Sequence, residues 1–338
     1  MTSTSFIARV RGVDAHILRL TVFLLALCLL FLIVKTRDFT SIGTWQSMAL
    51  QFPEYGIMAL GVMLTMMTGG IDLSSVGVAN MSAIVSASVM LAIAPRGADQ
   101  GQQLSAVAAG VLVALALGVL AGVLNGLLVA VVRIPAILVT LGTLELFTGV
   151  AIVVSEGKPI SGLPMAYSSL LGGKVLGVPT PLLIFVVMAL IVGFVLHKMS
   201  FGTKIQLLGS NATAAKFSGL DSVGLLVRTY ALSGLCASVA GLVMMANYNS
   251  AKADYGVTYT LLTVLIVVLG GVNPNGGNGR LVGVLLAIAI LQILSSGLNA
   301  FPQISNFYRP LIYGAVLLIV ISTTELGQRF RFRPKEKQ

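Results

Sequence analysis

Apolar segments of about 20 residues follow one another along almost the whole chain, and this pattern limits what the chain can fold into. A helix needs about 20 residues to cross the roughly 30 Å hydrocarbon core of a membrane. In lipid every backbone polar group must be paired within its own segment, so these segments are expected to be helices. The expected spans are residues 18–34, 46–67, 76–94, 104–132, 134–154, 180–197, 228–247, 259–271, 279–299 and 308–323. The sequence therefore predicts an all-α polytopic membrane protein with about ten transmembrane helices, of which the eighth is short enough to be broken or re-entrant.

The composition agrees with a chain whose surface faces lipid. Of all residues, 57% are hydrophobic and only 9% are charged, whereas soluble domains contain about 25% charged residues. The formal net charge of +10 does not indicate nucleic-acid binding, because the basic residues are spread among loops and the C-terminal tail. Both cysteines, Cys28 and Cys236, lie inside apolar segments, so we expect free thiols and neither a disulfide framework nor a metal site.

The distribution of lysine and arginine predicts the orientation of the spans. About two-thirds of the 21 basic residues fall on the side that carries both termini, and an excess of this kind marks the cytoplasmic side. We therefore expect residues 1–17 to be a cytoplasmic segment, 18–323 one transmembrane domain, and 324–338 a basic cytoplasmic tail near anionic headgroups. The start resembles a signal peptide, but no small-residue cleavage site follows it, so the first span is expected to be retained.

The segment 198–228 is too polar to lie in lipid, and it contains its own helix signals. Ser210 or Asn211 can cap a helix N-terminus, and Gly219 can end the helix in the left-handed conformation. A helix of about two turns is marginal in water and needs a surface to pack against. The side chains expected to meet that surface are Ala214, Ala215, Phe217 and Leu220. We interpret this segment as a docking site for another protein.

Two carboxylates lie inside expected spans. Glu54 follows Pro53, and Glu145 sits near the middle of the fifth span. A charge at mid-bilayer costs about 2.5–3.5 kcal/mol, so such residues face a bundle interior or a watery cavity. Two readings stay open for each: the carboxylate lines a path for a polar solute, or a protonated carboxyl bonds a neighbouring helix. Further polar residues within spans suit a path for a neutral hydroxylated solute, and equally bonds between helices; these are Asn80, Asn125, Thr140, Thr143, Asn247, Gln292 and Asn299.

Glycines mark close helix packing and turns. Gly118, Gly122 and Gly126 are spaced four residues apart, which lets another helix approach closely. Asp72, in the stretch GGIDLSS, is expected to cap the third helix after two glycines end the second. The glycine-rich stretch at 269–283 lacks the Lys-Ser/Thr of a phosphate-binding loop and is interpreted as a flexible turn. The predicted turn residues are Gly69, Gly70, Asp72, Gly270, Gly271, Gly276 and Gly277.

Catalytic chemistry has little support in this sequence. The only two histidines, His16 and His197, lie at the ends of spans. An intramembrane hydrolase or metal site would need such residues grouped inside the bundle. We therefore expect no enzyme activity, no cofactor and no metal.

Four stretches resemble the membrane permeases of bacterial ABC importers of the ribose and monosaccharide type, a family that includes autoinducer importers. They are TGGIDLSSVG (68–77), NGLLVAVVRIPAILVTLGTL (125–144), LGSNATAAKFSGLDSVGLLVRTYALSGLCASVAG (208–241) and VLGGVNPNGGNGRLVG (268–283). They occur in the family's order and spacing, and the likeness extends from about residue 45 to 323. One departure is Glu145, which stands where the family usually has an uncharged residue.

The resemblance implies a ten-helix permease of the vitamin-B12-importer class in the bacterial inner membrane, paired with a second permease. A separate cytoplasmic ATPase would supply energy, and a periplasmic binding protein would deliver a simple sugar or sugar-like furanose. The family's coupling helix, which contacts the ATPase, corresponds to Gly209, Asn211, Ala214, Ala215, Lys216, Ser218 and Gly219. The alternative is a proton-coupled secondary carrier in which Glu54 or Glu145 titrates within the membrane.

Overall fold

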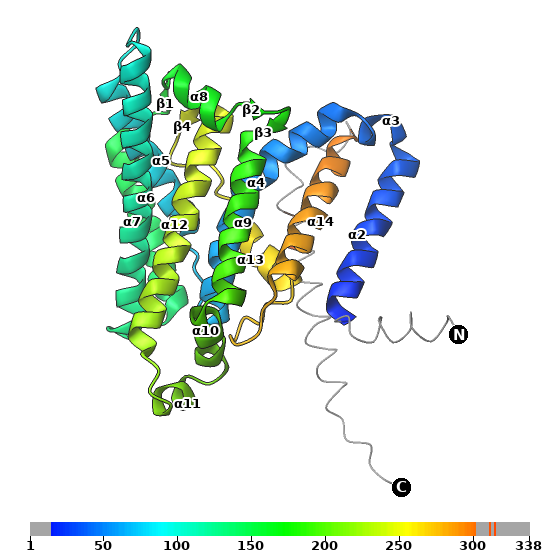
Figure 1. The fold of residues 1–338 in the computed structure, drawn as a ribbon, viewed down its shortest axis with the longest axis vertical. Helices are drawn as coiled ribbons and strands as arrows, with labels where there is room; N and C mark the ends of the chain where they lie inside the picture. Colours follow the sequence, from blue (N-terminus) through cyan, green and yellow to red (C-terminus); the bar gives the residue numbers. More distant parts are fainter. Residues whose placement is uncertain (1–14, 302–310, 312–313, 316–338) are drawn as a thin grey trace.

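The computed structural model describes residues 15–301, 311 and 314–315, and these form a bundle of helices (Figure 1). The helices are α2 (Ala15–Val34), α3 (Thr36–Phe39), α4 (Ile42–Met67), α5 (Ser75–Ile93), α6 (Gln100–Ala130), α7 (Ala136–Ser155), α8 (Met165–Leu171), α9 (Thr180–Lys198), α10 (Ser200–Ser210), α11 (Ala212–Phe217), α12 (Ser222–Tyr248), α13 (Tyr259–Leu269) and α14 (Leu281–Asn299). Four two-residue strands form two antiparallel pairs, β1 (Ile160–Ser161) with β4 (Ser250–Ala251), and β2 (Lys174–Val175) with β3 (Val178–Pro179).

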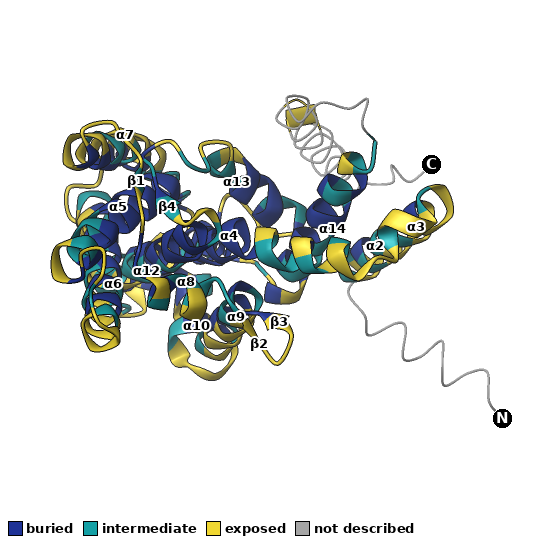
Figure 2. Ribbon diagram, turned by 90° about the horizontal axis from the view of Figure 1, so that it is seen from above, coloured by how far each residue is buried: buried dark blue, intermediate teal, exposed yellow. Residues whose placement is uncertain are grey.

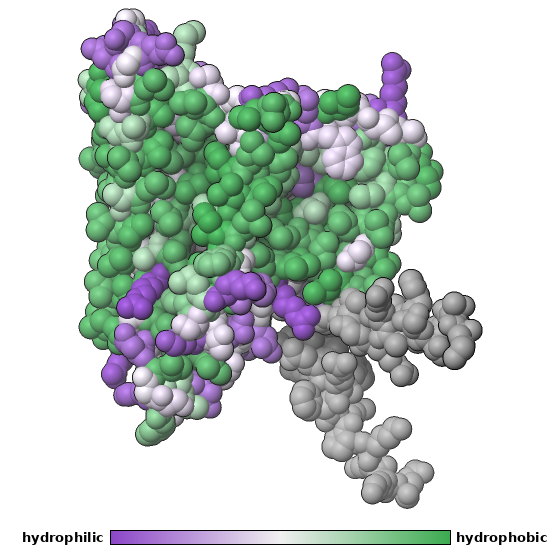
Figure 3. Space-filling model, in the orientation of Figure 1, coloured by the Kyte–Doolittle hydropathy of each residue, from purple (hydrophilic) through white to green (hydrophobic). Residues whose placement is uncertain are grey.

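Helices α4 and α12 form the centre of the bundle. From Pro53 to Met67 every residue of α4 is buried, and most of the second half of α12 is buried as well. Figure 2 shows these two helices in the interior, with α2, α6, α7 and α9 turning exposed faces outward. The visible surface is hydrophobic over a broad middle band, with hydrophilic residues gathered at the two ends (Figure 3). This arrangement is the one expected of a bundle whose sides face lipid.

Seven of the described helices are long and apolar enough to cross a membrane: α2, α5, α6, α7, α9, α12 and α14. Helix α4 is 26 residues long but contains Gln51, Pro53 and Glu54, and it is not among the seven. Helix α13 has only 11 residues. The chain is therefore a mostly helical, multi-pass membrane protein.

Nine of the ten expected spans each coincide with one of these helices, and the tenth, 308–323, lies largely outside the described residues. The expected segments 1–17 and 324–338 also fall mostly or wholly outside them. The prediction for 198–228 was incomplete, because this segment holds two helices, α10 and α11, and α12 already begins at Ser222. The N-cap of α12 is Asp221, whose Oδ1 accepts a hydrogen bond from Gly224 N at 2.9 Å.

The two ends of the bundle differ. One end carries α10, α11, the start of α2 and the loop 270–280, and we call it the α11 end (Figure 1). The opposite end, the α8 end, carries α3, α8 and both strand pairs. The sequence pattern did not predict α8 or the strands, because these elements are too short to show a hydrophobic period.

The predicted glycine stripe of α6 packs against α12. A β-carbon added at Gly122 would collide with the carbonyl oxygen of Tyr230, and one added at Gly118 would meet the carbonyl oxygen of Gly234. Gly126 lies equally close to the backbone of α12. The prediction that these glycines allow close helix approach is confirmed, since two backbones pack in direct contact only where side chains are missing.

Candidate functional site

Helix α11 projects from the α11 end of the bundle (Figure 1). Its N-cap is Asn211, whose Oδ1 accepts a hydrogen bond from Ala214 N at 2.9 Å. Its C-terminal turn closes through Gly219, at φ 76°, and Leu220 N donates to Ala215 O at 3.1 Å. Both predicted helix signals therefore hold, with Asn211 rather than Ser210 as the cap. A helix of only six residues is marginal alone in water, so its caps and its packing on the bundle must hold it in place.

Fewer side chains of α11 are exposed to a partner than the sequence predicted. Phe217 is 89% exposed, and Ala214 is exposed beside it. Ala215, in contrast, is 5% exposed and belongs to the main hydrophobic core, and Leu220 is half-buried. The expectation that all four side chains face a partner was wrong for Ala215, because this residue attaches α11 to the bundle. Four of the five other residues assigned to this helix by resemblance are exposed: Asn211, Lys216, Ser218 and Gly219.

Gly209 lies at a contact between three segments rather than on the α11 surface. A β-carbon there would collide with the carbonyl oxygen of Met67, at the end of α4, and would press on Gly277 N. Gly277 N in turn donates to Met67 O at 2.9 Å. A β-carbon at Gly276 would press on both Gly69 N and Gly209 O, so three of the stretches that carried the resemblance meet at the α11 end.

The predicted turn glycines build this junction. Gly69, Gly271, Gly276 and Gly277 all have positive φ, between 85° and 92°. Gly70 and Gly270 do not have positive φ; Gly270 is the C-cap of α13.

Asp72 ties the start of α5 to α6 and α12. Its Oδ1 accepts hydrogen bonds from Ser74 N at 2.9 Å and Ser74 Oγ at 2.6 Å, and its Oδ2 accepts from Ser233 Oγ at 2.7 Å. Asn125 Nδ2 donates to Ser74 Oγ at 2.8 Å. The capping prediction was wrong in detail, because the N-cap residue is Ser74, which has no side-chain cap bond. Asp72, Ser74, Ser233 and Asn125 therefore belong to one buried polar network.

Both carboxyl oxygens of Glu54 accept hydrogen bonds. Its Oε1 accepts from Asn247 Nδ2 at 2.8 Å, and its Oε2 accepts from Tyr259 OH at 3.0 Å. Asn247 Nδ2 also donates to Leu50 O at 2.8 Å, one turn before Glu54 and beside the Pro53 interruption. Glu54 is 2% exposed. The carboxyl group of Glu54 thus joins α4 to α12 and α13 through hydrogen bonds.

A cavity of about 320 Å³ lies between α5, α7 and the connection from α12 to α13. Its polar lining residues are Asn80, Glu145, Thr148, Lys252, Asp254 and Thr260. The remaining lining residues are mainly aliphatic. Of the residues expected to line a solute path, Asn80 and Glu145 therefore meet at one cavity, whereas Glu54, Asn125 and Thr143 do not line it.

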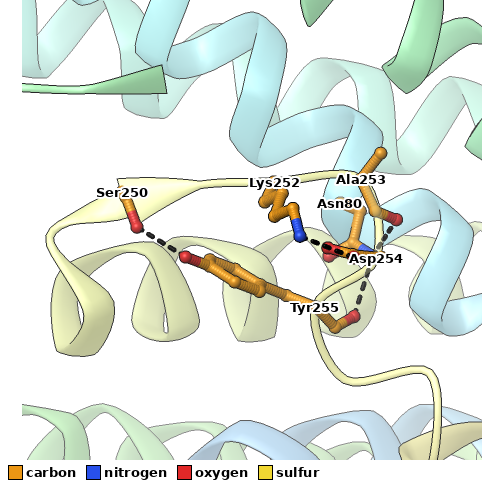
Figure 4. A network of polar contacts seen from close by, with 6 residues as sticks. All are labelled: Asn80, Ser250, Lys252, Ala253, Asp254 and Tyr255. Atoms are coloured by element: carbon orange, nitrogen blue, oxygen red, sulfur yellow. Dashed lines mark hydrogen bonds and ion pairs between the residues drawn. The ribbon is translucent and has the colours of Figure 1, made fainter. Parts of the chain in front are cut away.

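Asn80 holds one wall of this cavity in place. Its Nδ2 donates to Ala253 O at 2.8 Å and to Tyr255 O at 2.9 Å, as Figure 4 shows. Its Oδ1 is buried and has no hydrogen-bond partner. On the same connection Lys252 Nζ lies 2.7 Å from Asp254 Oδ2, and this carboxylate raises the pKa of the lysine.

Several cavity residues were missed by the sequence analysis. Lys252 and Asp254 lie in a connection between helices, and their only sequence signal was a pair of charges in a chain with few charges. Thr148 and Thr260 are single hydroxyl residues in apolar segments, which are as common in helix packing. Within the part of the chain that the structure describes, no three His, Cys, Asp or Glu side chains form a group able to hold a metal ion.

The chain was compared with known proteins. Residues 44–321 match the family model described as branched-chain amino acid transport system / permease component. The chain is 34% identical to the ribose import permease protein RbsC of Escherichia coli strain K12, over 88% of this chain and 91% of the relative. It is 33% identical to RbsC of Bacillus subtilis strain 168, over 79% of this chain and 80% of the relative. It is 30% identical to the autoinducer 2 import system permease protein LsrD of Escherichia coli strain HS, over 79% of each chain. No solved structure matches the chain.

These findings confirm the resemblance read from the four sequence stretches. The family and the relatives are described as permeases, which are transport components and not enzymes. The family match covers most of the chain, including the α11 segment and the cavity. The chain belongs to the branched-chain amino acid transport system permease family.

Proposed function

We propose that this protein is the permease subunit of an ATP-driven ABC importer in the bacterial inner membrane, and that it carries a simple sugar or sugar-like furanose. Its partners would be a cytoplasmic ABC ATPase, a periplasmic binding protein and a second permease, either identical or different. The names of the relatives, which import ribose and autoinducer 2, support this solute class. The proposal includes ten spans, a bundle of the vitamin-B12-importer class and cytoplasmic termini.

The observation that carries the proposal is the exposed, capped helix α11. We assign it as the coupling helix, whose Phe217 side chain is inserted into a groove of the ATPase. Helix α10, which directly precedes α11, contacts α4, α9 and α12. Closure of the ATPase on ATP would push α11, and α10 would pass this movement to the three helices as a rigid-body shift.

The cavity beside Glu145 is the proposed contact point for the solute. Among the described residues the Glu145 carboxylate has no hydrogen bond or ion pair, although it lies exposed near the middle of α7. Such a charge is unfavourable against lipid and needs water or a ligand. Asn80 Oδ1 is a second acceptor without a donor at this cavity. Two unfilled acceptors between aliphatic walls suit the hydroxyl donors of a sugar, and the volume suits a small ligand.

Replacing Glu145 by alanine should lower the initial uptake rate at limiting solute concentration by about tenfold to 100-fold. A hydrogen bond to a charged acceptor contributes about 1.5–3 kcal/mol, and about 1.4 kcal/mol corresponds to a factor of ten. Glu145→Gln, which keeps an acceptor oxygen, should retain more activity than Glu145→Ala. Thr143→Val on the same helix is the control, since Thr143 is buried away from the cavity. Unchanged uptake by Glu145→Ala would remove this residue from the path.

Reconstitution separates the proposed importer from a proton-coupled carrier. The permease is placed in proteoliposomes with its ATPase and binding protein, and uptake of radiolabelled ribose and related pentoses is measured with and without ATP. An ABC importer should require ATP and continue when a protonophore collapses the proton gradient. Uptake by the permease alone, driven by a proton gradient, would instead establish the carrier.

A further inference from the structure

A short hairpin at the α8 end carries an apolar tip. Strands β2 and β3 are joined by a two-residue turn, Leu176–Gly177. Both residues have positive φ, 53° for Leu176 and 82° for Gly177. Leu176 is 100% exposed, and its neighbour Val175 is 51% exposed. The tip of the hairpin is therefore formed by bare aliphatic side chains.

Leucine is an unfavourable choice for this turn in water. The left-handed conformation crowds the β-carbon against the following carbonyl oxygen, so turns of this kind favour Asn or Asp before Gly. Full exposure also leaves the whole leucine side chain in contact with water. In an apolar medium the leucine side chain would no longer contact water. Such a medium at the tip therefore favours leucine over asparagine.

The hairpin lies where a membrane border is expected. Strand β3 contacts α4 and α9, and Lys174 Nζ donates to Gln46 Oε1 at 2.8 Å. The adjacent residue Trp45 is 47% exposed, and tryptophan is enriched at membrane–water interfaces. Figure 2 shows β2 and β3 at the outer edge of the bundle, beside α9, rather than over its centre.

The surface that continues from the hairpin along α9 is apolar. Residues Leu183, Val186, Leu190 and Phe194 are exposed at helical spacing on this helix. A stripe of this length has the character of a lipid-facing surface. Strand β3 leads directly into α9, so the apolar tip and the stripe lie on consecutive elements that start at the α8 end.

We propose that Val175 and Leu176 insert into the headgroup–acyl boundary of the leaflet at the α8 end, and that they anchor the start of α9 there. Lys174 donates one of its three ammonium hydrogens to Gln46 and keeps two for lipid phosphates. A lipid surface fits better than a protein partner, because the tip lies at the rim beside the apolar face of α9. The inference is independent of the proposed transport function.

The single tryptophan of the chain makes a direct test possible. Trp45→Phe provides a background without tryptophan, and Leu176→Trp places the only indole at the tip. The purified permease is reconstituted in phosphatidylcholine vesicles, and its fluorescence is measured with brominated phosphatidylcholine or with aqueous iodide. Lys158→Trp is the water-exposed control, since the Lys158 side chain is 78% exposed in a charged loop. Leu190→Trp, near the middle of α9, is the control within the acyl chains.

The indole at position 176 should emit at shorter wavelength than the Lys158→Trp protein and should be quenched several-fold more by brominated lipid. Its iodide quenching should be less than half that of the Lys158→Trp protein. Iodide quenching equal to the water-exposed control would overturn the proposal. So would protection from iodide that arises only when a binding protein is added, because the occupant would then be a protein.

A second measurement keeps the proposal testable where Trp45→Phe fails to fold. Cys28→Ser and Cys236→Ala remove both thiols, and Leu176→Cys carries a nitroxide spin label. Collisions of the label with oxygen, which concentrates in lipid, should exceed collisions with a water-soluble nickel chelate. The opposite ratio would place the tip in water and contradict the anchor.

Discussion

Replacing Gly122 by leucine should leave almost no folded protein. The added side chain begins with a β-carbon that would collide with the carbonyl oxygen of Tyr230 on α12. Neither backbone can yield, because α6 and α12 pack along the whole glycine stripe and α12 is largely buried. Inserting bulk into packed cores usually costs about 1–3 kcal/mol, and a forced separation of two central helices belongs in the rarer class above about 4 kcal/mol. The yield of monodisperse protein in detergent and its thermal unfolding midpoint measure this loss.

Gly142→Leu is the matched control for the same change. Gly142 also lies in the middle of a long helix, but nothing surrounds the position where its β-carbon would stand. Leucine favours a helix interior over glycine by about 0.8–1 kcal/mol. The Gly142 variant of the isolated permease should therefore be as stable as the original protein or slightly more stable. Equal yields and unfolding midpoints for both variants would show that the packing of α6 on α12 is looser than described.

The sequence predicted the membrane-spanning helices well, because a span needs about 20 apolar residues and this requirement is visible in any window of the chain. Helix α10 was missed, since its amphipathic face packs on the bundle and its polarity resembled a loop. The sequence also predicted the start of α12 too late, at residue 228 instead of Ser222. Residues 222–227 are held by the Asp221 cap and by packing, and the apolar pattern did not reveal where that helix begins.

The candidate site was only partly predictable. A carboxylate inside a span indicates a polar environment, and the sequence gives this same indication for Glu54 and Glu145. In the structure Glu54 is surrounded by hydrogen-bond donors, whereas Glu145 lines a cavity. Glu54 meets Asn247 and Tyr259, about 200 positions away along the chain, and such meetings follow from tertiary packing alone. Glu145 meets no donor among the described residues. Which polar residues are satisfied internally, and which face a cavity, is decided by the fold.

The coupling role proposed for α11 leads to the second large effect. Phe217→Asp should lower ATP-driven uptake by more than about 30-fold and should weaken co-purification with the ATPase to a similar degree. Buried aromatic anchors at protein interfaces contribute about 2–4 kcal/mol, which corresponds to roughly 30-fold to 1,000-fold in affinity. The fold of the permease should be unaffected, since Phe217 is 89% exposed and belongs to none of the hydrophobic clusters.

Phe217→Leu distinguishes a docking side chain from a general effect of charge. Leucine keeps an apolar group at the same position, so this variant should retain most of the affinity and at least a third of the uptake. Gly219→Pro tests the helix rather than its side chain, because proline cannot adopt the φ of 76° found at Gly219. If Phe217→Asp binds the ATPase and transports normally, α11 is not the coupling helix, and the energy for transport must enter the bundle elsewhere. If only Gly219→Pro fails, the coupling surface is the backbone and the small residues of α11 rather than its one exposed aromatic ring.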